Sequence, residues 1–201
     1  MKKLALFDFD GTLTTKDTLL EFFKFRDGIL KFYKGMLLLA PVLVALKLKL
    51  LPNWKAKEVF LTYFLKNCSQ EIFNLDCQKF AHDAIPDMLR REAVVALNQH
   101  LESDDKIFIV SASPANWIEH WVGQRSIDVL ATKLDVKNGL LTGKLQGRNC
   151  YGVEKVRRIE SVLDYTKYDQ IFVYGDSRGD KEMLNLATHA FYKKFFTSGY
   201  Q

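Results

Sequence analysis

The run LALFDFDGTL at residues 4–13 decides the fold that this sequence predicts. Its first four residues are apolar and make a segment of strand length, and the glycine after the second aspartate marks a turn. Residues two apart in an extended chain point to the same side. Asp8 and Asp10 can therefore face one small volume beyond the end of a buried strand, while Phe7 and Phe9 pack elsewhere.

A long helical stretch follows this strand. Apolar residues with helical spacing fill the chain from about residue 17 to residue 100, and glycine or proline interrupts them at four places. The interruptions are Gly28, Pro41, Pro52 and Pro86. The stretch therefore predicts several helices, inserted over the end of the first strand as an all-helical cap. We expect residues 15–86 to form this cap, and residues 1–14 and 87–201 to form the core.

Strands and helices alternate in the second half of the chain. The expected strands cover residues 106–110, 127–136, 140–145, 170–174 and 190–192, and the expected helices begin at Pro114, Val153 and Gly179. Asn138-Gly139 is a strong hairpin signal. This alternation predicts an α/β fold, a Rossmann-like parallel sheet with helices on both faces. In such sheets ligands bind beyond the carboxyl ends of the strands.

Four aspartates are expected near that edge of the sheet, namely Asp8, Asp10, Asp176 and Asp180. Two negative charges about 5 Å apart repel each other by roughly 3 kcal/mol at an effective dielectric of about 20. A cluster of four therefore needs a cation. Carboxylate ligands without histidine or cysteine nearby favour Mg²⁺, which binds one or two carboxylates, waters and a substrate phosphate oxygen.

Two further residues suit a phosphate at the same edge. Ser111 directly follows an apolar strand and can donate to a phosphate oxygen from the start of a helix. Lys155, near the start of its helix, can supply a fixed positive charge. The chemistry that fits is phosphoryl transfer through a covalent aspartyl-phosphate, with a second carboxylate acting as acid and base.

These motifs, in this order, resemble those of the haloacid dehalogenase superfamily. The resemblance rests on DFDGTL at residues 8–13, on Ser111, on Lys155 and on GDSRGD at residues 175–180, and it spans nearly the whole chain. It implies a phosphatase with a helical cap. The carboxylate at position 10 favours phosphatases and mutases over the dehalogenases and cation pumps of the superfamily.

The resemblance also implies roles for single residues. Asp8 would be the nucleophile and Asp10 the general acid and base. The expected Mg²⁺ contacts are the Asp8 side chain, the Asp10 carbonyl and Asp176, with Asp180 orienting the metal shell. The residues expected to contact the substrate are Gly11, Thr12, Asp17, Ser111, Ala112 and Lys155.

Two branches of the superfamily suggest different substrates. VKNGLLTG at residues 136–143 is similar to phosphoserine phosphatase, and Asp17 lies where that enzyme has a glutamate for the substrate amine. NCYGVEKV at residues 149–156 and the uncharged run MLLLAPVLVAL at residues 36–46 resemble the phosphatidylglycerophosphatase C type. We expect a phosphomonoester on a lipid, such as phosphatidylglycerophosphate, with phosphoserine or another small soluble metabolite as the alternative. A nucleotide or sugar phosphatase, a phosphomutase and a catalytically silent scaffold are further alternatives.

The uncharged run at residues 36–46 suggests a contact with a membrane surface. Eleven helical residues span about 16 Å, roughly half of a bilayer core, so the run cannot cross alone. Lysines on both sides suit a segment lying in the interface. The alternatives are a buried core of the cap and a dimer contact.

Positive charge is concentrated in the same part of the chain. Residues 16–66 hold ten Lys or Arg against four Asp or Glu, whereas charge nearly cancels elsewhere. This surplus fits an anionic membrane, a solvated face, or a nucleic-acid-binding module as the non-enzyme alternative. We expect no nucleic acid partner, because that alternative has no need of four spaced acids.

The cysteines and the N-terminus predict a cytoplasmic protein, with a peripheral contact to the cytoplasmic face of the membrane as an option. Cys68, Cys77 and Cys150 have no metal-ligand spacing and are expected to be inert thiols in a reducing compartment. The first apolar run is cut by Asp8, too early for a secretory signal.

Overall fold

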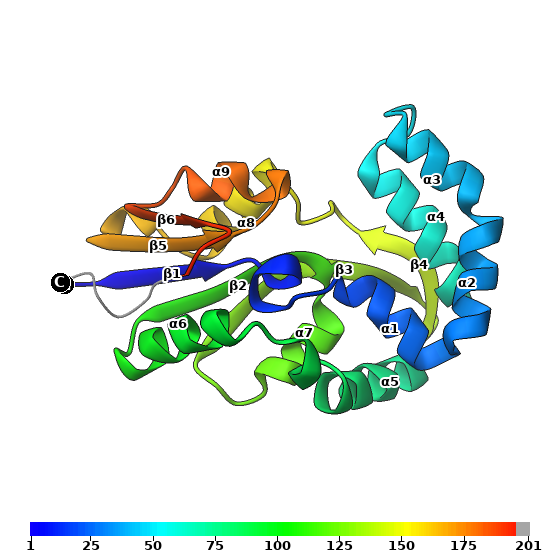
Figure 1. The fold of residues 1–201 in the computed structure, drawn as a ribbon, viewed down its shortest axis with the longest axis horizontal. Coiled ribbons are helices and arrows are strands. Elements are labelled where there is room, and N and C mark those ends of the chain that lie inside the picture. Colours follow the sequence, from blue (N-terminus) through cyan, green and yellow to red (C-terminus); the bar gives the residue numbers. More distant parts are fainter. Residues whose placement is uncertain (196–201) are drawn as a thin grey trace.

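A computed structural model describes residues 1–195 of the chain, and in these residues six strands form one sheet (Figure 1). In sheet order the strands are β4 (Leu140–Gln146), β3 (Ile127–Lys137), β2 (Lys106–Pro114), β1 (Lys3–Phe7), β5 (Gln170–Gly175) and β6 (His189–Tyr192). Every neighbouring pair is parallel except β3 and β4, which form an antiparallel hairpin. The predicted α/β fold is confirmed.

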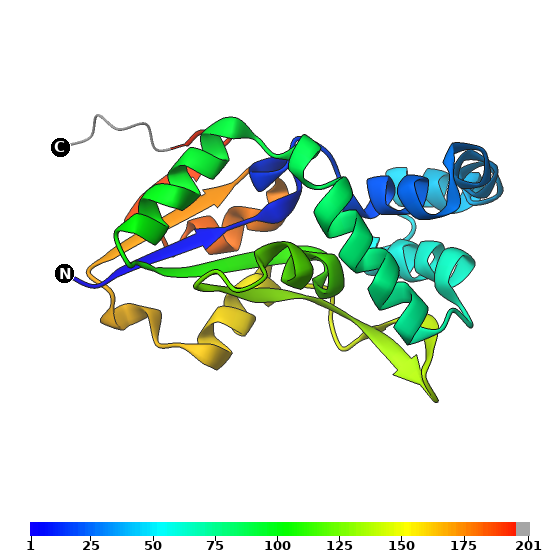
Figure 2. The same ribbon diagram turned by 90° about the horizontal axis from the view of Figure 1, so that it is seen from below.

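Helices cover both faces of this sheet, as predicted. Side chains of β1 alternate between the two faces: Ala5 and Phe7 belong to one buried apolar cluster, and Leu4 and Leu6 belong to another. Helices α6 (Arg91–Glu102) and α7 (Ala115–Val122) cover the first cluster, and α8 (Val153–Val162) and α9 (Lys181–Leu184) cover the second. Figure 2 shows α6 and α8 on opposite sides of the sheet.

Five α-helices lie between β1 and α6 in the chain. They are α1 (Thr18–Asp27), α2 (Ile29–Leu38), α3 (Ala40–Lys47), α4 (Asn53–Leu65) and α5 (Gln70–Asp83). Gly28 ends α1, Pro52 immediately precedes α4, and Pro86 begins a single helical turn, which matches three of the predicted interruptions. Pro41 lies in the first turn of α3, and the axes of α2 and α3 meet at 61°.

The β3–β4 hairpin forms part of the platform on which these helices rest. Asn138 and Gly139 both have positive φ, as the predicted hairpin turn requires. Thr62 on α4 donates to the carbonyl of Gly143 over 3.3 Å. Gly143 is needed there, because a Cβ at this position would lie 2.3 Å from the Cα of Thr62.

The chain enters and leaves the inserted helices side by side. Thr14 and Leu89 form an antiparallel bridge, and the amide of Thr15 donates to the carbonyl of Met88 over 2.7 Å. The indole of Trp117 on α7 stacks on Phe22 of α1 at 4.9 Å, so one apolar cluster continues from the sheet into the inserted helices. The division at residues 14/15 and 86/87 stays a prediction.

Two predicted boundaries differ in the structure. Strand β2 continues past Ser111 to Pro114, and α7 begins at Ala115, because β2 still pairs with β3 through Pro114 and Thr132. The helix expected from about residue 179 is shorter. Ser177 and Asp180 form a capping box around one tight turn, and the regular helix α9 starts only after it.

Candidate active site

A buried lysine joins two aspartates at the carboxyl edge of the sheet. Asp8 directly follows β1, and its amide donates to the carbonyl of Tyr174 on β5 over 2.9 Å. Lys155, in the first turn of α8, donates to Asp8 Oδ1, Asp180 Oδ1 and the Val110 carbonyl, each over 2.6 Å. This ammonium therefore fixes the two carboxylates beside each other, although their positions in the chain are far apart.

Asp176 adds a third carboxylate to this pair. Oxygen atoms of Asp8, Asp176 and Asp180 all lie within 4.8 Å of one another. The Oδ1 atom of Asp176 is buried, and no hydrogen-bond partner for it is present in the described part of the chain. An unpaired buried carboxylate oxygen is costly unless a cation meets it. The candidate metal ligands are all carboxylate oxygens, so these residues fit Mg²⁺.

Gly11 makes room for this third carboxylate. It has φ +79°, and a Cβ there would lie 2.4 Å from Asp176 Oδ2. Thr12 is buried, and its hydroxyl donates to Asp8 Oδ2 over 3.4 Å. The turn after β1 thus leaves space for Asp176 and donates a hydrogen bond to Asp8.

The charges in this group do not balance. Burial lowers the pKa of the Lys155 ammonium, but Asp8 and Asp180 outweigh this effect, so its pKa lies above its usual value. Burial raises the pKa of the Asp8 carboxyl to about 7, although Lys155 opposes this shift. Burial, helped by the charge of Asp180, also raises the pKa of Asp176. Three carboxylates share one ammonium, and the excess negative charge is what a divalent cation neutralises.

The carboxylate of Asp10 lies apart from the group of three, in contrast to the expected cluster of four acids. Its Oδ1 accepts hydrogen bonds from the amide of Thr18 over 2.6 Å and from the hydroxyl of Thr18 over 2.5 Å. Thr18 begins α1 and also accepts a hydrogen bond from the indole of Trp117 over 3.1 Å. The inserted helices therefore orient Asp10.

The sequence suggested that Ser111 lies at the start of a helix, but in the structure it lies within strand β2. It is fully buried within β2, accepts from the amide of Ser113 over 3.0 Å and donates to Asp10 Oδ2 over 3.4 Å. The next residues, Ala112 and Ser113, line the cavity described below.

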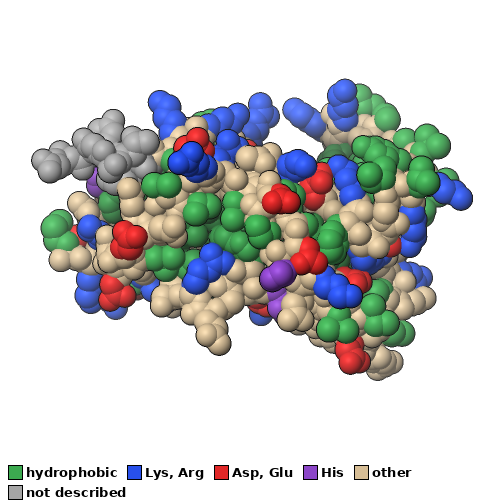
Figure 3. All heavy atoms as spheres, turned by 60° about the horizontal axis from the view of Figure 1, so that its bottom comes forward, with side chains coloured by type: hydrophobic (Ala, Val, Ile, Leu, Met, Phe, Trp, Pro, Cys, Tyr) green, Lys and Arg blue, Asp and Glu red, His purple; other side chains and the backbone are tan. Residues whose placement is uncertain are grey.

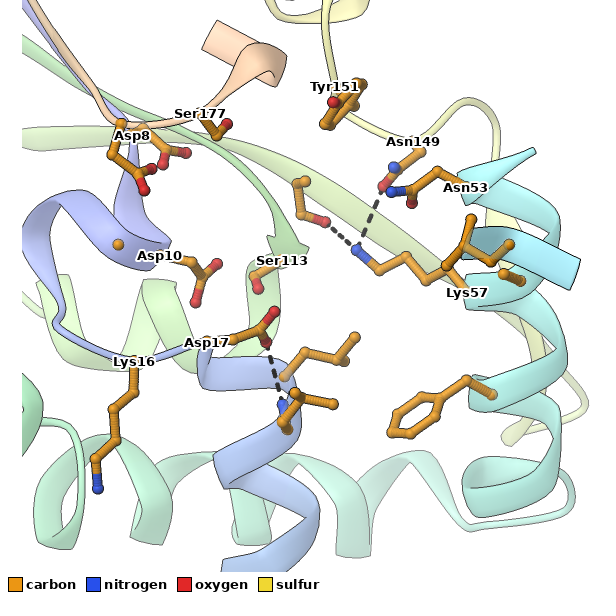
Figure 4. A pocket seen from close by; sticks show the side chains of 18 of the residues that line it. Asp8, Asp10, Lys16, Asp17, Asn53, Lys57, Ser113, Asn149, Tyr151 and Ser177 are labelled. Atoms are coloured by element: carbon orange, nitrogen blue, oxygen red, sulfur yellow. Dashed lines mark hydrogen bonds between the residues drawn. The ribbon is translucent and has the colours of Figure 1, made fainter. Parts of the chain in front are cut away.

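A cavity of about 460 Å³ opens above these groups, between the sheet edge and the inserted helices (Figure 4). Asp8, Asp10, Asp17, Lys155 and Asp176 contribute to its polar lining. Its apolar wall comes from α1, α3 and α4 and contains Leu19, Leu20, Leu43, Leu46, Ala56 and Phe60. The cavity thus combines an acidic floor with a mainly aliphatic wall.

Asp17 faces the same cavity from the start of α1 (Figure 4). Its Oδ1 accepts from the amide of Leu20 over 3.2 Å, which caps the helix. Burial, followed by the charge of Asp10, raises the pKa of Asp17. It is therefore both a helix cap and a cavity residue.

Lys57 is a cavity residue that the sequence did not single out. It reaches from α4 across to the core and donates to the Ala112 carbonyl over 2.6 Å and to Asn149 Oδ1 over 3.4 Å (Figure 4). Burial lowers the pKa of its ammonium, and Asp10 and Asp17 oppose this effect. The helical spacing of the apolar residues is the one sequence signal that could have pointed to Lys57. It lies beside Ala56 and three residues before Phe60, which are both buried, and so on the inward side of α4.

Comparisons with known proteins identify the family. The model of the haloacid dehalogenase-like hydrolase family matches residues 5–185. Protein CicA from Caulobacter vibrioides is 34% identical over 194 residues, which cover 96% of this chain and 86% of that protein.

Solved structures share the fold. A Bordetella pertussis Tohama I protein of unknown function has a TM-score of 0.81 at 21% identity, with 96% of this chain and 90% of that chain covered. A substrate-bound phosphoserine phosphatase has a TM-score of 0.60 at 20% identity, with 93% and 83% covered. The family match spans the turn after β1, the buried lysine and the acidic loop after β5, so this chain belongs to the haloacid dehalogenase-like hydrolases and is an enzyme.

Proposed function

We propose that the protein is a Mg²⁺-dependent phosphomonoester hydrolase that works through an aspartyl-phosphate on Asp8. The observation that carries this proposal is the contact of Lys155 with both Asp8 and Asp180, beside Asp176 at the floor of the cavity. Asp8, Asp176 and Asp180 would hold or orient the ion, with the Asp10 carbonyl as a further ligand. The ion, when bound, neutralises charge on the phosphate and the carboxylates.

The hydrogen bonds of Asp8 indicate which of its oxygens attacks. Oδ1 is held by Lys155 at 2.6 Å, whereas Oδ2 has a long contact with the Thr12 hydroxyl at 3.4 Å. Oδ2 forms a bond to phosphorus as the bond from phosphorus to the leaving oxygen breaks, and Asp10 gives its proton to that oxygen. Asp10 then takes a proton from the attacking water, the bond from Oδ2 to phosphorus breaks, and inorganic phosphate leaves.

The apolar wall of the cavity supports a lipid-linked phosphate, such as phosphatidylglycerophosphate, as the substrate. Leu43 and Leu46 of α3 and Phe60 of α4 line the same cavity as Asp8, and in this proposal they contact the leaving group once the phosphate has reached Asp8. In this proposal residues 15–86 act as the cap that selects the leaving group, in a protein of the cytoplasm that contacts the membrane surface.

Phosphoserine is the alternative substrate, and the position of Asp17 favours it. This carboxylate faces the cavity and could receive an amine, while Lys57 brings a positive charge into the same cavity from α4. The two candidates differ in the contacts of the inserted helices and share the reaction at Asp8.

A substitution of the nucleophile tests the reaction. Asp8→Asn should abolish hydrolysis of para-nitrophenyl phosphate in the presence of Mg²⁺ and leave the circular dichroism spectrum unchanged. Asp164→Asn, an exposed acid outside the cavity, is the matched control and should keep the wild-type rate. A folded Asp8→Asn enzyme with the wild-type rate would show that the nucleophile is assigned wrongly.

A side-by-side assay tests the substrate class. Detergent-dispersed phosphatidylglycerophosphate and phosphoserine are supplied to the same enzyme with Mg²⁺, and kcat/KM is compared. The lipid proposal predicts the higher value for the lipid. A value for phosphoserine that is about tenfold higher, equal to roughly 1.4 kcal/mol of transition-state binding, removes the lipid proposal and leaves the reaction assignment intact.

A further inference from the structure

The outward side of helices α2 and α3 carries an unusual amount of exposed apolar surface. Eight large apolar side chains on this side and in the segment after α3 are each at least 56% exposed. They are Ile29, Leu30, Tyr33, Leu37, Leu38, Val44, Leu48 and Leu50, and they are called the α2–α3 face below. Figure 3 shows green side chains interspersed with blue ones at this end of the molecule. Apolar patches of this kind mark an interaction surface.

The opposite side of α2 is held firmly by the protein. Phe32 is buried, and its ring stacks with Phe64 of α4 at a centroid distance of 6.1 Å. Gly35 allows this approach, because a Cβ there would lie 2.6 Å from Phe64 Cζ. Helix α2 is therefore seated on α4 along one side and exposes leucines along the other.

The charged residues within the α2–α3 segment all have one sign, although Lys31 pairs with Asp27 of α1 over 2.7 Å. Residues 29–57 contain six lysines and no acidic residue, and Lys31, Lys34, Lys47 and Lys49 are exposed. Leucines beside lysines with aliphatic stems match the acyl boundary and the anionic head groups of a membrane surface. A second copy of this face would set these lysines against each other, and a nucleic acid would leave the leucines without an apolar partner.

The geometry of the helix pair favours a position along the membrane surface. In the described residues no single helix is long and apolar enough to cross a membrane, and α2 and α3 pass such a test only as a pair that bends by 61°. Because α2 packs against α4 along one side, the helix pair would meet a membrane with its outward side rather than with its ends.

The same helix connects this face with the active-site cavity. Leu43 and Leu46 of α3 line the cavity, while Val44 on the same helix and Leu48 directly after it are exposed. We propose that the α2–α3 face docks the enzyme on an anionic lipid bilayer and so places the rim of the cavity at the lipid head groups. This inference deepens the proposed function, because it names the surface from which the substrate is taken.

Vesicle flotation tests the docking step. The wild-type protein should float with vesicles of phosphatidylglycerol and phosphatidylcholine, and much less with vesicles of phosphatidylcholine alone or at high salt. The double variant Leu37→Glu/Leu48→Glu should reduce the bound fraction by at least about tenfold, since each substitution puts a charge where an exposed leucine would enter the acyl boundary of the bilayer. Lys47→Glu/Lys49→Glu should weaken binding to the anionic vesicles selectively.

Matched controls keep the experiment interpretable. Val162→Glu on α8 and Lys79→Glu on α5 change exposed residues of the same types away from this face and should bind like the wild type. All variants should hydrolyse soluble para-nitrophenyl phosphate at the wild-type rate, which shows that they are folded. The double leucine variant should lose activity only on lipid phosphate presented in vesicles.

Other results overturn the inference. Absence of wild-type vesicle binding, or equal binding by the leucine variant, shows that this face does not dock on lipid. A wild-type dimer that the leucine variant splits into monomers shows that a second copy covers the face. Salt-sensitive binding to DNA or RNA without vesicle binding assigns the lysines to nucleic acid. Vesicle binding without hydrolysis of any phosphomonoester would remove the proposed function and leave the docking surface standing.

Discussion

Lys155 controls the charge balance of the cavity floor. It is 2% exposed and meets two buried carboxylates, so Lys155→Met leaves Asp8 and Asp180 without a counter-charge. We expect a loss of about 3–5 kcal/mol in the free energy of unfolding without Mg²⁺, and a fall in kcat of about 10²–10³-fold. Urea denaturation and steady-state kinetics measure the two effects.

The control for this prediction is an exposed ion pair. Lys167→Met breaks the contact with Asp164, in which the lysine side chain is 74% exposed, and should change the unfolding free energy by less than about 0.5 kcal/mol. Equal stability of the Lys155→Met and wild-type proteins would mean that the buried contact of Lys155 is not formed in solution.

Lys57 is a second lysine of the cavity, and it comes from α4. Lys57→Met keeps most of the stem but removes the donor to the Ala112 carbonyl and a positive charge in the cavity. KM for para-nitrophenyl phosphate should rise about fivefold, the equivalent of roughly 1 kcal/mol of attraction to the phosphate, while kcat changes little. Lys55→Met, an exposed lysine on the same helix, serves as the control. A fall in kcat at constant KM would instead assign Lys57 to the chemical step.

Two glycines of the β3–β4 hairpin test how α4 is positioned. Gly143 and Gly139 both have positive φ, but only a Cβ at Gly143 would clash with Thr62, whereas nothing lies within 4 Å of one at Gly139. Gly139→Ala should lower the unfolding free energy by about 1 kcal/mol through backbone strain alone. Gly143→Ala should lower it by about 1–3 kcal/mol more and raise KM, because α4 carries Lys57. Equal effects of the two substitutions on stability and KM would contradict this.

The contact of α6 with β5 predicts a pH dependence of stability. His100 on α6 is buried, with Nδ1 2.7 Å from Asp105 Oδ2 and Nε2 3.0 Å from the Tyr174 hydroxyl. Tyr174 donates to Nε2 when the ring is neutral. Burial lowers the pKa of His100, although Asp105 opposes the shift. The unfolded chain therefore takes up this proton first as the pH falls below about 6.5, so the contribution of His100 to stability should decline in that range.

A pair of histidine variants isolates this effect. His100→Gln should remove this contribution, so its unfolding free energy should fall less, relative to the wild type, as the pH drops below about 6.5, the ordinary pKa of histidine. His82→Gln, at a histidine whose side chain is 88% exposed, should keep the wild-type pH dependence. If both variants follow the wild-type curve, His100 does not cause the pH dependence.

At the scale of the whole molecule, the sheet and the helix order were predictable from sequence. Apolar runs of strand length identified the strands, Asn138-Gly139 identified the hairpin, and Gly28 and Pro52 marked the helix breaks. Each of these signals lies within one short segment, because the apolar pattern and the turn residues of that segment indicate its conformation. Boundaries were less certain where tertiary contacts extend an element, as at Pro114, which pairs with β3.

The candidate site could be predicted only in part, because several of its contacts join distant segments. Motifs in short segments pointed to Asp8, Asp176, Asp180 and Lys155, which the structure brings together. Lys57 has no such motif, and the lysines of residues 29–57 look alike in sequence. The position of Lys57 in the cavity depends on how α4 rests on the hairpin. The link from Asp10 to Thr18 and Trp117 likewise depends on the packing of α1 against α7.

The most direct test of the central claim is a crystal structure of the enzyme with Mg²⁺ and beryllium fluoride, after activity on a phosphomonoester has been verified in the same preparation. We expect beryllium fluoride bonded to Asp8 Oδ2, with Lys155 and a metal ion beside it and Asp176 among the metal ligands. An active enzyme whose Asp8 stays unmodified in those crystals, with the cavity empty, would contradict it.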